Sequence, residues 1–260
     1  MSVLLKNAPV YYALCQVRFN PVAAMAKFSS EIQDRMRRIG YTVFENDETQ
    51  TVEFNEEQLQ NGTPTLTTTQ TWYFTKSDRS CGFVLGHNFL TFQSTNYSDR
   101  EKFFEALCVG LDIVHEIVQL ESVVRIGIRY LNAVIPEAGE SINLYLNTQV
   151  QTIDFGLSAT GGMWQAVYKA SQGVLIAKVY HAPNLPLGFP MDLIPRSLQL
   201  LKRFQITQPM THAVIDMDLY VEEVVDIDTR VIYEKLLGFH KDLAACFHAI
   251  ATDYAFDKWS

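Results

Sequence analysis

Residues 67–95 read TTTQTWYFTKSDRSCGFVLGHNFLTFQST and carry the clearest structural signal in the chain. Three short runs in this stretch are rich in threonine, aromatic or β-branched residues: Thr67–Thr75, Gly82–Gly86 and Phe89–Thr95. Turn residues separate them at Asp78-Arg79-Ser80 and at His87-Asn88. Short β-prone runs joined by tight turns are typical of antiparallel hairpins. We therefore expect an antiparallel sheet at the centre of the fold.

A strand followed by a helix is expected before this stretch. The strand covers Tyr12–Phe19, where polar and apolar residues alternate towards its end. Asn20-Pro21 is typical of a helix start, because asparagine caps a free amide and proline has no amide to leave unpaired. Apolar residues recur at helical spacing as far as Ile39, and Gly40 is a typical residue after a helix end.

The rest of the chain repeats the same kinds of element. Two longer helices are expected, one beginning at the cap Ser98 and the other at the cap Asp228. Further strands are expected at Val123–Ile135, Met163–Lys169, Val174–His181 and His212–Val225. This order indicates two related halves, 1–120 and 121–260, although the second half lacks an early helix. We expect one α+β domain over residues 1–260, with a mainly antiparallel sheet packed by long helices.

Length and composition are those of a globular protein with a large core. The chain has 260 residues, of which 48% are hydrophobic and 19% charged, and its formal net charge is −8. An acidic chain lacks the excess of lysine and arginine that nucleic-acid binding needs, so nucleic acid is not an expected partner. No apolar run approaches the ~20 residues of a membrane span, and the first residues do not match a secretory signal. Because the cysteines are widely spaced, we expect a cytoplasmic protein with reduced thiols. We also expect no membrane partner.

Common catalytic and cofactor motifs are missing from the sequence. Gly161-Gly162 lacks the lysine and hydroxyl residue of a phosphate-binding loop, and residues 156–159 lack the last glycine of a nucleophile elbow. The histidines include no HExxH pair. His240 is a candidate binding residue, although a histidine that is hydrogen-bonded at the core edge is the commoner case. We expect no metal and no cofactor, and the sequence favours a protein that is not an enzyme.

The most concentrated charge feature is acidic. The stretch from Asp216 to Asp228 contains several carboxylates and no basic residue. Asp216 and Asp218 share one face of the expected strand. These two aspartates are candidates to hold a divalent cation or to receive a basic partner, and Glu222 is a further candidate binding residue. The alternative is a solvated strand face followed by carboxylates that cap a helix.

A second charged feature is the strand RIGIRYLN at residues 125–132. Arg125 and Arg129 share one face, and the glycine between them leaves room for an approaching group. Arginine binds carboxylates or phosphates through two parallel hydrogen bonds, so both arginines and Asn132 are candidate binding residues. An internal salt bridge to the aspartates of residues 216–218 is an equally good explanation of the arginines.

The proline-rich segment Ala182–Pro209 is long for a connection without regular structure. Long loops are often functional, so its Leu187 and Phe189 are candidates to contact a partner or to cover a pocket. A short helix is expected around Arg196–Phe204.

Several segments along nearly the whole chain share one pattern with known proteins. They are Asn7-Ala8-Pro9 with ALCQVRF at 13–19, Phe89–Phe92, RIGIRYLN at 125–132, Ile215–Asp218 and LGFH at 237–240. Together they resemble a sporadically distributed, uncharacterised bacterial protein family of about the same length. The resemblance implies a cytoplasmic bacterial protein of a kind often carried on mobile or defence-related loci. It implies no activity and no catalytic residue.

Two functions remain as hypotheses. The first is a protein-binding accessory module without catalysis, comparable to an antitoxin, an immunity protein or a defence-system component, whose acidic surface attracts a basic partner. The alternative is a small-ligand-binding or enzymatic domain with a pocket between the sheet and the long helices. That pocket would be lined by Arg125, Arg129, Asp216, Asp218 and His240. Another protein is the expected partner, and a homodimer is a further expectation.

Overall fold

The computed structural model describes residues 5–53, 65–193 and 195–260. The elements of the first half are β1 (Val10–Phe19), α1 (Met25–Arg38), β2 (Val43–Glu53), β3 (Thr65–Thr75), β4 (Cys81–Leu85), β5 (Phe89–Ser94) and α3 (Arg100–Val118). Those of the second half are β6 (Ser122–Val134), β7 (Gly162–Lys169), β8 (Val174–Leu185), β9 (Met210–Asp226), α4 (Thr229–Ile250) and α5 (Asp253–Trp259), together with short 3-10 turns.

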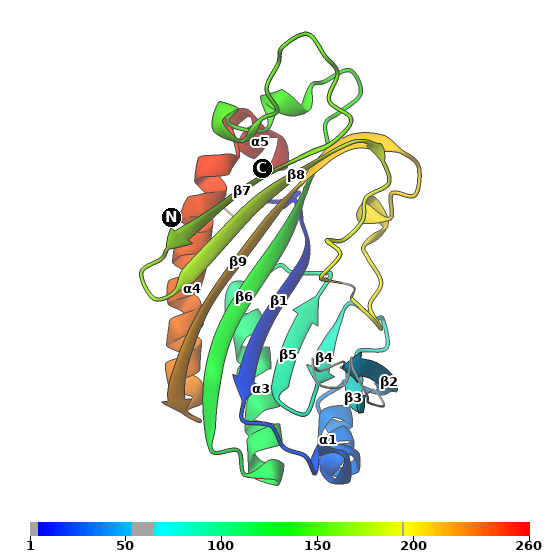
Figure 1. Cartoon of the computed structure of the whole chain (residues 1–260), viewed down its shortest axis with the longest axis vertical. Coiled ribbons are helices and arrows are strands. Elements are labelled where there is room, and N and C mark those ends of the chain that lie inside the picture. The colour runs from blue at the N-terminus through cyan, green and yellow to red at the C-terminus, as the bar shows by residue number, and fades with distance from the viewer. Residues whose placement is uncertain (1–4, 54–64, 194) are drawn as a thin grey trace, which may run out of the picture.

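Within the described ranges, the strands form one nine-stranded sheet in the order β2-β3-β4-β5-β1-β6-β9-β8-β7 (Figure 1). Each neighbouring pair is antiparallel. β1 and β6 meet in the middle, where Leu14 lies opposite Arg129. The expectation of an α+β fold with a mainly antiparallel sheet is therefore confirmed.

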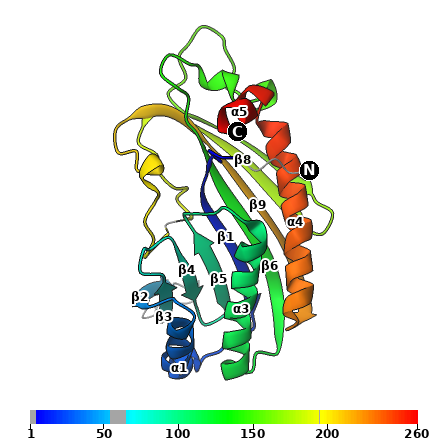
Figure 2. The same cartoon turned by 180° about the vertical axis from the view of Figure 1, so that it is seen from behind.

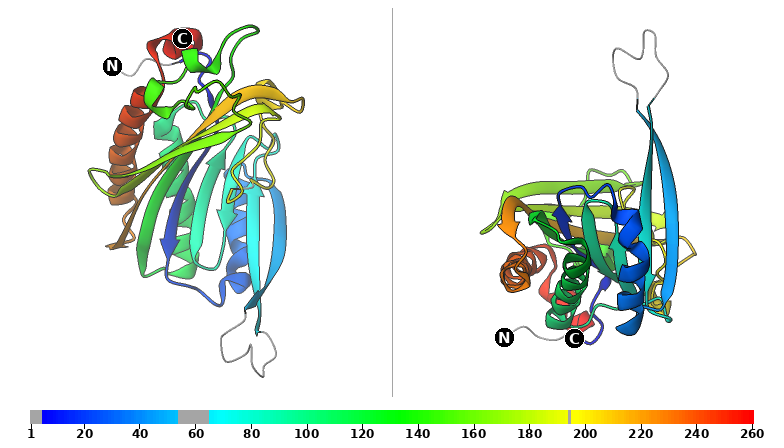
Figure 3. Two further views of the ribbon diagram at one scale, coloured as in Figure 1. Left: turned by 45° about the horizontal axis from the view of Figure 1, so that its top comes forward. Right: turned by 90° about the horizontal axis from the view of Figure 1, so that it is seen from below.

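Helices α1, α3 and α4 lie side by side on one face of the sheet, which curves around them (Figures 2 and 3). Side chains alternate along each strand, so residues such as Cys15 and Ile128 point into the core beneath the helices. Gly110 allows α3 to approach β4 closely, because a Cβ atom there would lie 2.3 Å from the Phe83 ring. The main core therefore fills the space between this face and the helices.

The proline-rich segment covers part of the opposite face. Leu187 and Phe189 pack in a second apolar cluster with Tyr11 and Tyr12 of β1. The short helix expected at 196–204 is not formed beyond a 3-10 turn at Lys202–Phe204. The backbone there bonds to β5 and to the residue after it instead. The side chain of Gln93 donates to the carbonyl of Arg196 at 3.3 Å, and that of Thr95 donates to the carbonyl of Gln199 at 2.6 Å.

Two helices begin later than expected from the sequence. α1 starts at Met25 rather than at Pro21, because the intervening chain is held by the β4–β5 turn, where the Val22 amide donates to the His87 carbonyl at 2.8 Å. α3 is capped by Asp99 rather than Ser98. The expected cap Asp228 of α4 is confirmed, and Gly40 follows α1 with a positive φ of 96°. The polar stretch Glu56–Thr65, with Gly62 and Pro64, also predicts a loop, and all of it before Thr65 lies outside the described residues.

Candidate functional site

The candidate residues taken from the sequence lie on opposite faces of the sheet. The face away from the helices carries Arg125, Arg129, Asp216, Asp218 and Glu222, as the alternation along β6 and β9 requires. Asn132 alternates to the helix-covered face, and His240 lies on α4 above that face. The structure therefore separates His240 from the charged residues with which it was expected to line one pocket.

Arg129 and Asp216 form a buried ion pair. Nε and Nη2 of Arg129 each donate to one carboxylate oxygen of Asp216 at 2.7 Å, and only 2% of the Asp216 side chain is exposed. Asp192, in the proline-rich segment, accepts from Nη1 at 2.7 Å, and this hydrogen bond lowers the pKa of Asp192. Removing one partner of a buried pair leaves an uncompensated charge. This is the internal salt bridge that the sequence left open as an alternative.

Arg125 and Asp218 lie next to that pair. The guanidinium of Arg125 stacks on the ring of Tyr220 at 4.2 Å from its centre. Asp218 is opposite Arg129 in register, and burial raises the pKa of its carboxyl against the opposing charges of Arg129 and Arg125. Glu222 is exposed and is the register partner of Arg125. Positive and negative groups therefore compensate each other on this face.

Asn132 and His240 are hydrogen-bonded inside the protein. Nδ2 of Asn132 donates to the carbonyl of Ile215 at 3.4 Å. Nδ1 of His240 is 3.2 Å from the hydroxyl of Tyr130, which is 3.1 Å from the hydroxyl of Tyr97. Burial is the main cause that lowers the pKa of His240 to about 4, so this side chain is neutral at pH 7. It lies at the edge of the core, the commoner case for a lone histidine.

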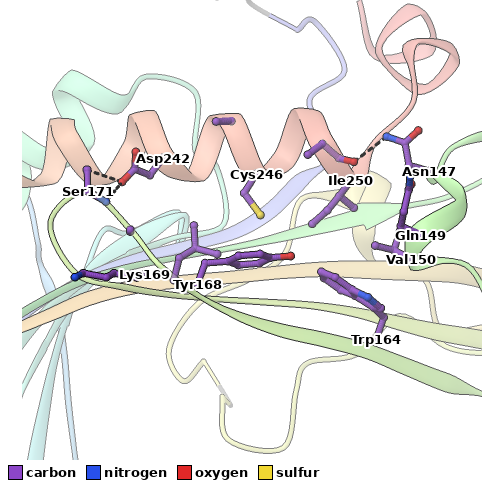
Figure 4. A pocket seen from close by; sticks show the side chains of 14 residues that line it. Asn147, Gln149, Val150, Trp164, Tyr168, Lys169, Ser171, Asp242, Cys246 and Ile250 are labelled. Atoms are coloured by element: carbon purple, nitrogen blue, oxygen red, sulfur yellow. Dashed lines mark hydrogen bonds between the residues drawn. The ribbon is translucent and has the colours of Figure 1, made fainter.

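A cavity of about 690 Å³ lies elsewhere, between α4 and the β7–β8 hairpin (Figure 4). We call it the α4 groove. Its walls are largely apolar and include Trp164, Tyr168, Leu175, Ala245, Cys246, Ala249 and Ile250. Burial raises the pKa of the Cys246 thiol to about 11, so the sulfur is protonated at neutral pH and forms part of the apolar wall. The groove can therefore receive apolar groups but offers no activated thiol.

Polar groups close the two ends of the α4 groove. At one end, the amide and the hydroxyl of Ser171 both donate to Oδ2 of Asp242, at 2.9 and 2.6 Å. At the other end, Nδ2 of Asn147 donates to the carbonyl of Ala249 at 2.8 Å. These bonds attach the hairpin and the 147–150 turn to α4, so the groove has fixed ends.

β7 forms one rim of the groove and one edge of the sheet. Its sequence, GMWQAVYK, has a charge only at Lys169. Met163 and Val167 on its outer face are 56% and 60% exposed, and Tyr168 on the groove side is 47% exposed. An exposed apolar edge strand can pair with another chain.

The opposite edge, β2, is different. It carries Glu45, Asp47 and Glu48, and Arg79 pairs with Glu45 at 2.8 Å while Arg196 pairs with Asp47. Charged side chains on an edge strand disfavour pairing with another chain. Of the two edge strands, β7 is therefore better suited than β2 to pair with a further strand.

The groove residues were not among the candidates taken from the sequence. Alternation in residues 163–169 predicts a strand but not its position at the sheet edge, which depends on pairing between distant segments. One signal was present on α4, where Ala245 and Ala249 recur on one side at a spacing of four. Small residues beside an apolar stripe indicate a side of the helix that leaves space.

Comparisons with known proteins give no guide to this site. No protein-family model, curated protein or solved structure matches the chain. Among the described residues, no helix is long and apolar enough to cross a membrane. Over the same ranges, no group of three His, Cys, Asp or Glu side chains is placed to hold a metal ion. The function must therefore be argued from geometry.

Proposed function

We propose that the protein is a protein-binding module whose partner adds an extended segment to the edge strand β7. The difference between the two sheet edges carries this proposal, because β7 presents apolar side chains where β2 presents charges. The loop before β7 adds Ile153, Phe155 and Leu157, which are 83%, 71% and 71% exposed. Exposed apolar surface of this kind marks interaction sites in stable proteins. Strand addition to a sheet edge is a common mode of peptide recognition.

We also propose that the chain consists of two related halves, 1–120 and 121–260, and the strand order supports this. Counting outward from the β1–β6 pair, β5, β4, β3 and β2 follow on one side and β9, β8 and β7 on the other. Helix α3 follows β5, as α4 follows β9. In this correspondence β7 matches β3, and no strand within the described ranges lies beside β7 as β2 lies beside β3. A partner strand would complete the pattern.

In this proposal, the carboxylates of β9 are not the surface to which the partner docks, although the sequence made them candidates for that role. Asp216 is engaged with Arg129 and is only 1% exposed, so it is not accessible to a partner. The net charge of −8 still attracts a basic partner over a distance. Acidity therefore steers the partner, and β7 binds it. The setting in a defence-related or mobile locus rests on the family resemblance alone.

A small apolar ligand in the α4 groove is the second candidate. The cavity of about 690 Å³ favours it, since ligand sites commonly measure roughly 300–1,000 Å³. This candidate is second because a ligand in the groove would leave Met163 and Val167 on the other face of β7 uncovered.

Purification from the native host tests the proposed function. We would compare the wild type with Val167→Pro, which removes a backbone donor of β7, and with Val167→Thr as the matched control. Native mass spectrometry should show a stoichiometric second protein on the wild type and on Val167→Thr, and its loss from Val167→Pro.

A partner retained equally by all three proteins would contradict docking at β7. Should Val167→Pro fail to fold by circular dichroism, Val167→Lys takes its place, because a charge on the edge also disfavours pairing. A retained small-molecule mass on an otherwise single chain would instead support the second candidate.

A further inference from the structure

We propose that the segment that binds β7 is basic, runs antiparallel to β7, and inserts alternate apolar side chains into the α4 groove. This inference rests on the proposed function, because it names the chemistry of the segment that docks there. It adds a direction, a side-chain pocket and a charge to the description of the partner.

The backbone of β7 offers hydrogen-bonding groups at every second residue. The amide of Ala170 donates to the carbonyl of Gly173 at 2.9 Å and so closes the hairpin, and the β7–β8 register continues without a shift. Hydrogen-bonded and non-hydrogen-bonded pairs alternate along an antiparallel ladder. Counting from Ala170, the backbone groups that point away from β8 belong to Met163, Gln165, Val167 and Lys169. Four residues of β7 are thus available to an added strand.

The direction of the added strand follows from the pairing of β2 with β3. That pairing is antiparallel, and Phe44 of β2 stacks on Phe74 of β3 with ring centres 5.4 Å apart. β7 matches β3 in the proposed correspondence of the halves. The added strand therefore runs antiparallel to β7, and its apolar side chains contact the aromatic residues of β7 as Phe44 contacts Phe74.

The α4 groove lies on the face to which every second side chain of the added strand would point. Trp164 and Tyr168 form its β7 wall and alternate with the outward backbone positions (Figure 4). On α4, the short side chains of Ala245 and Ala249 face them and leave the space open. In strand addition, pockets for alternate side chains provide the specificity. Apolar residues at every second position of the segment fit this arrangement.

The charge of the partner follows from Asp242 and from the whole chain. Ser171 occupies Oδ2 of Asp242, and Oδ1 makes no hydrogen bond to another group in the described part of the chain. The amino group of Lys169 is turned away from the groove (Figure 4). A lysine or arginine near the end of the segment can therefore reach Asp242. A second copy of this chain is disfavoured, because two molecules of charge −8 repel each other.

Defined peptides test the proposal by fluorescence anisotropy. The probe is a labelled peptide of eight residues, as many as β7 contains, which alternates leucine with threonine and has lysine at both ends. One control peptide has serine in place of leucine, and another has glutamate in place of lysine. We expect the first peptide to bind, and each control to bind about tenfold more weakly or worse. Added salt should weaken binding of the first peptide.

Two pairs of protein variants separate the edge from the groove. Val167→Pro removes an outward amide of β7, and Val167→Thr is its control. The double variant Ala245→Leu/Ala249→Leu fills the groove from exposed positions, and Lys241→Leu is its control at an exposed position of α4 that does not line the groove. Both test proteins should lose at least about tenfold in peptide affinity, and both controls should bind like the wild type. Circular dichroism and the thermal midpoint report whether each variant is folded, and Val167→Lys replaces Val167→Pro if the latter does not fold.

The failures of the two proposals differ. If the edge variant loses the peptide and the groove variant binds like the wild type, docking at β7 stands and the groove inference is overturned. If neither variant loses the peptide, both proposals are overturned. Equal or tighter binding of the glutamate peptide overturns the basic partner. A dimer in sedimentation that Val167→Pro abolishes would make a second copy the occupant and also overturn it.

Discussion

Arg129 joins two distant segments of the chain through one guanidinium. It donates to Asp216 inside the sheet and to Asp192 in the proline-rich segment. Burying an ion pair costs desolvation energy that only good geometry offsets. The pair therefore specifies how the segment sits on the sheet more than it adds to stability.

Removal of one member of this pair should be costly. In Arg129→Met, we expect the free energy of unfolding to fall by about 3–5 kcal/mol, because Asp216 is left buried and unpaired. The double variant Arg129→Met/Asp216→Leu should recover most of the loss. Urea unfolding measures both.

Arg125→Met is the matched control for that prediction. Its guanidinium stacks on Tyr220, and loss of such a contact should cost about 1 kcal/mol or less. Equal losses for Arg129→Met and Arg125→Met would contradict the structural role of the buried pair.

His240 should make the stability depend on pH. Its pKa is lowered from 6.5 to about 4 in the folded protein, so the unfolded chain binds more protons between these pH values. The free energy of unfolding should therefore fall as the pH is lowered from about 6.5 to about 4, by no more than about 3 kcal/mol. In His240→Gln this part of the dependence should be lost, whereas the exposed His87→Gln should keep it. Urea unfolding of the wild type, His240→Gln and His87→Gln between pH 4 and pH 7 measures this dependence. Identical pH profiles for the three proteins would contradict the prediction.

At the level of elements, the first residues of the helices show which features depend on local sequence and which depend on long-range contacts. The cap of α3 is Asp99, whose carboxylate accepts from the amides of Glu101 and Lys102 at 2.9 and 3.3 Å. Ser98 is the neighbouring residue that the sequence pattern favoured. Asp99→Ala should lower the free energy of unfolding by about 1 kcal/mol, and Ser98→Ala should leave it nearly unchanged. The reverse order of the two effects in urea unfolding would show that Ser98 is the cap.

The local sequence pattern predicted the helices and strands. Most differences between the prediction and the structure arise from contacts between distant segments of the chain. Alternation and turn residues placed the hairpins, and Asp228 was identified as the cap of α4. The late start of α1 depends on the bond between Val22 and His87, and the missing helix at 196–204 depends on bonds to the sheet. Such bonds join residues far apart in sequence, so no local spacing shows them.

The candidate site was predicted less well than the fold, for the same reason. The pairing of Arg129 with Asp216 was foreseen as one alternative, because both lie on expected strands with matching faces. Which strand lies at the sheet edge depends on the order of all the strands. The sequence around Val167 therefore does not show that this residue lies at an edge of the sheet.

At the level of the whole molecule, the β1–β6 pairing unites the two halves of the chain. The register runs from Val10 opposite Asn132 to Phe19 opposite Val123. Long-range pairing of this kind makes unfolding of one half expose the core of the other. The two halves should therefore unfold together.

Single-tryptophan variants test this cooperativity. Trp72 lies on β3 in the first half and Trp259 on α5 in the second. A protein that retains only Trp72 and one that retains only Trp259, with phenylalanine at the other positions, should report the same midpoint in urea as circular dichroism does for each. Two separate midpoints within one variant would show that the halves unfold independently.

Amide hydrogen exchange at β7 tests the proposed docking most directly. In the free protein, the outward amides of Met163, Gln165, Val167 and Lys169 should exchange rapidly, because these amides point away from β8 and do not donate to it. On addition of the lysine-ended leucine peptide, these amides should become protected while those of β2 stay unchanged. Protection of β2 or β9 without protection of β7 would contradict strand addition at this edge.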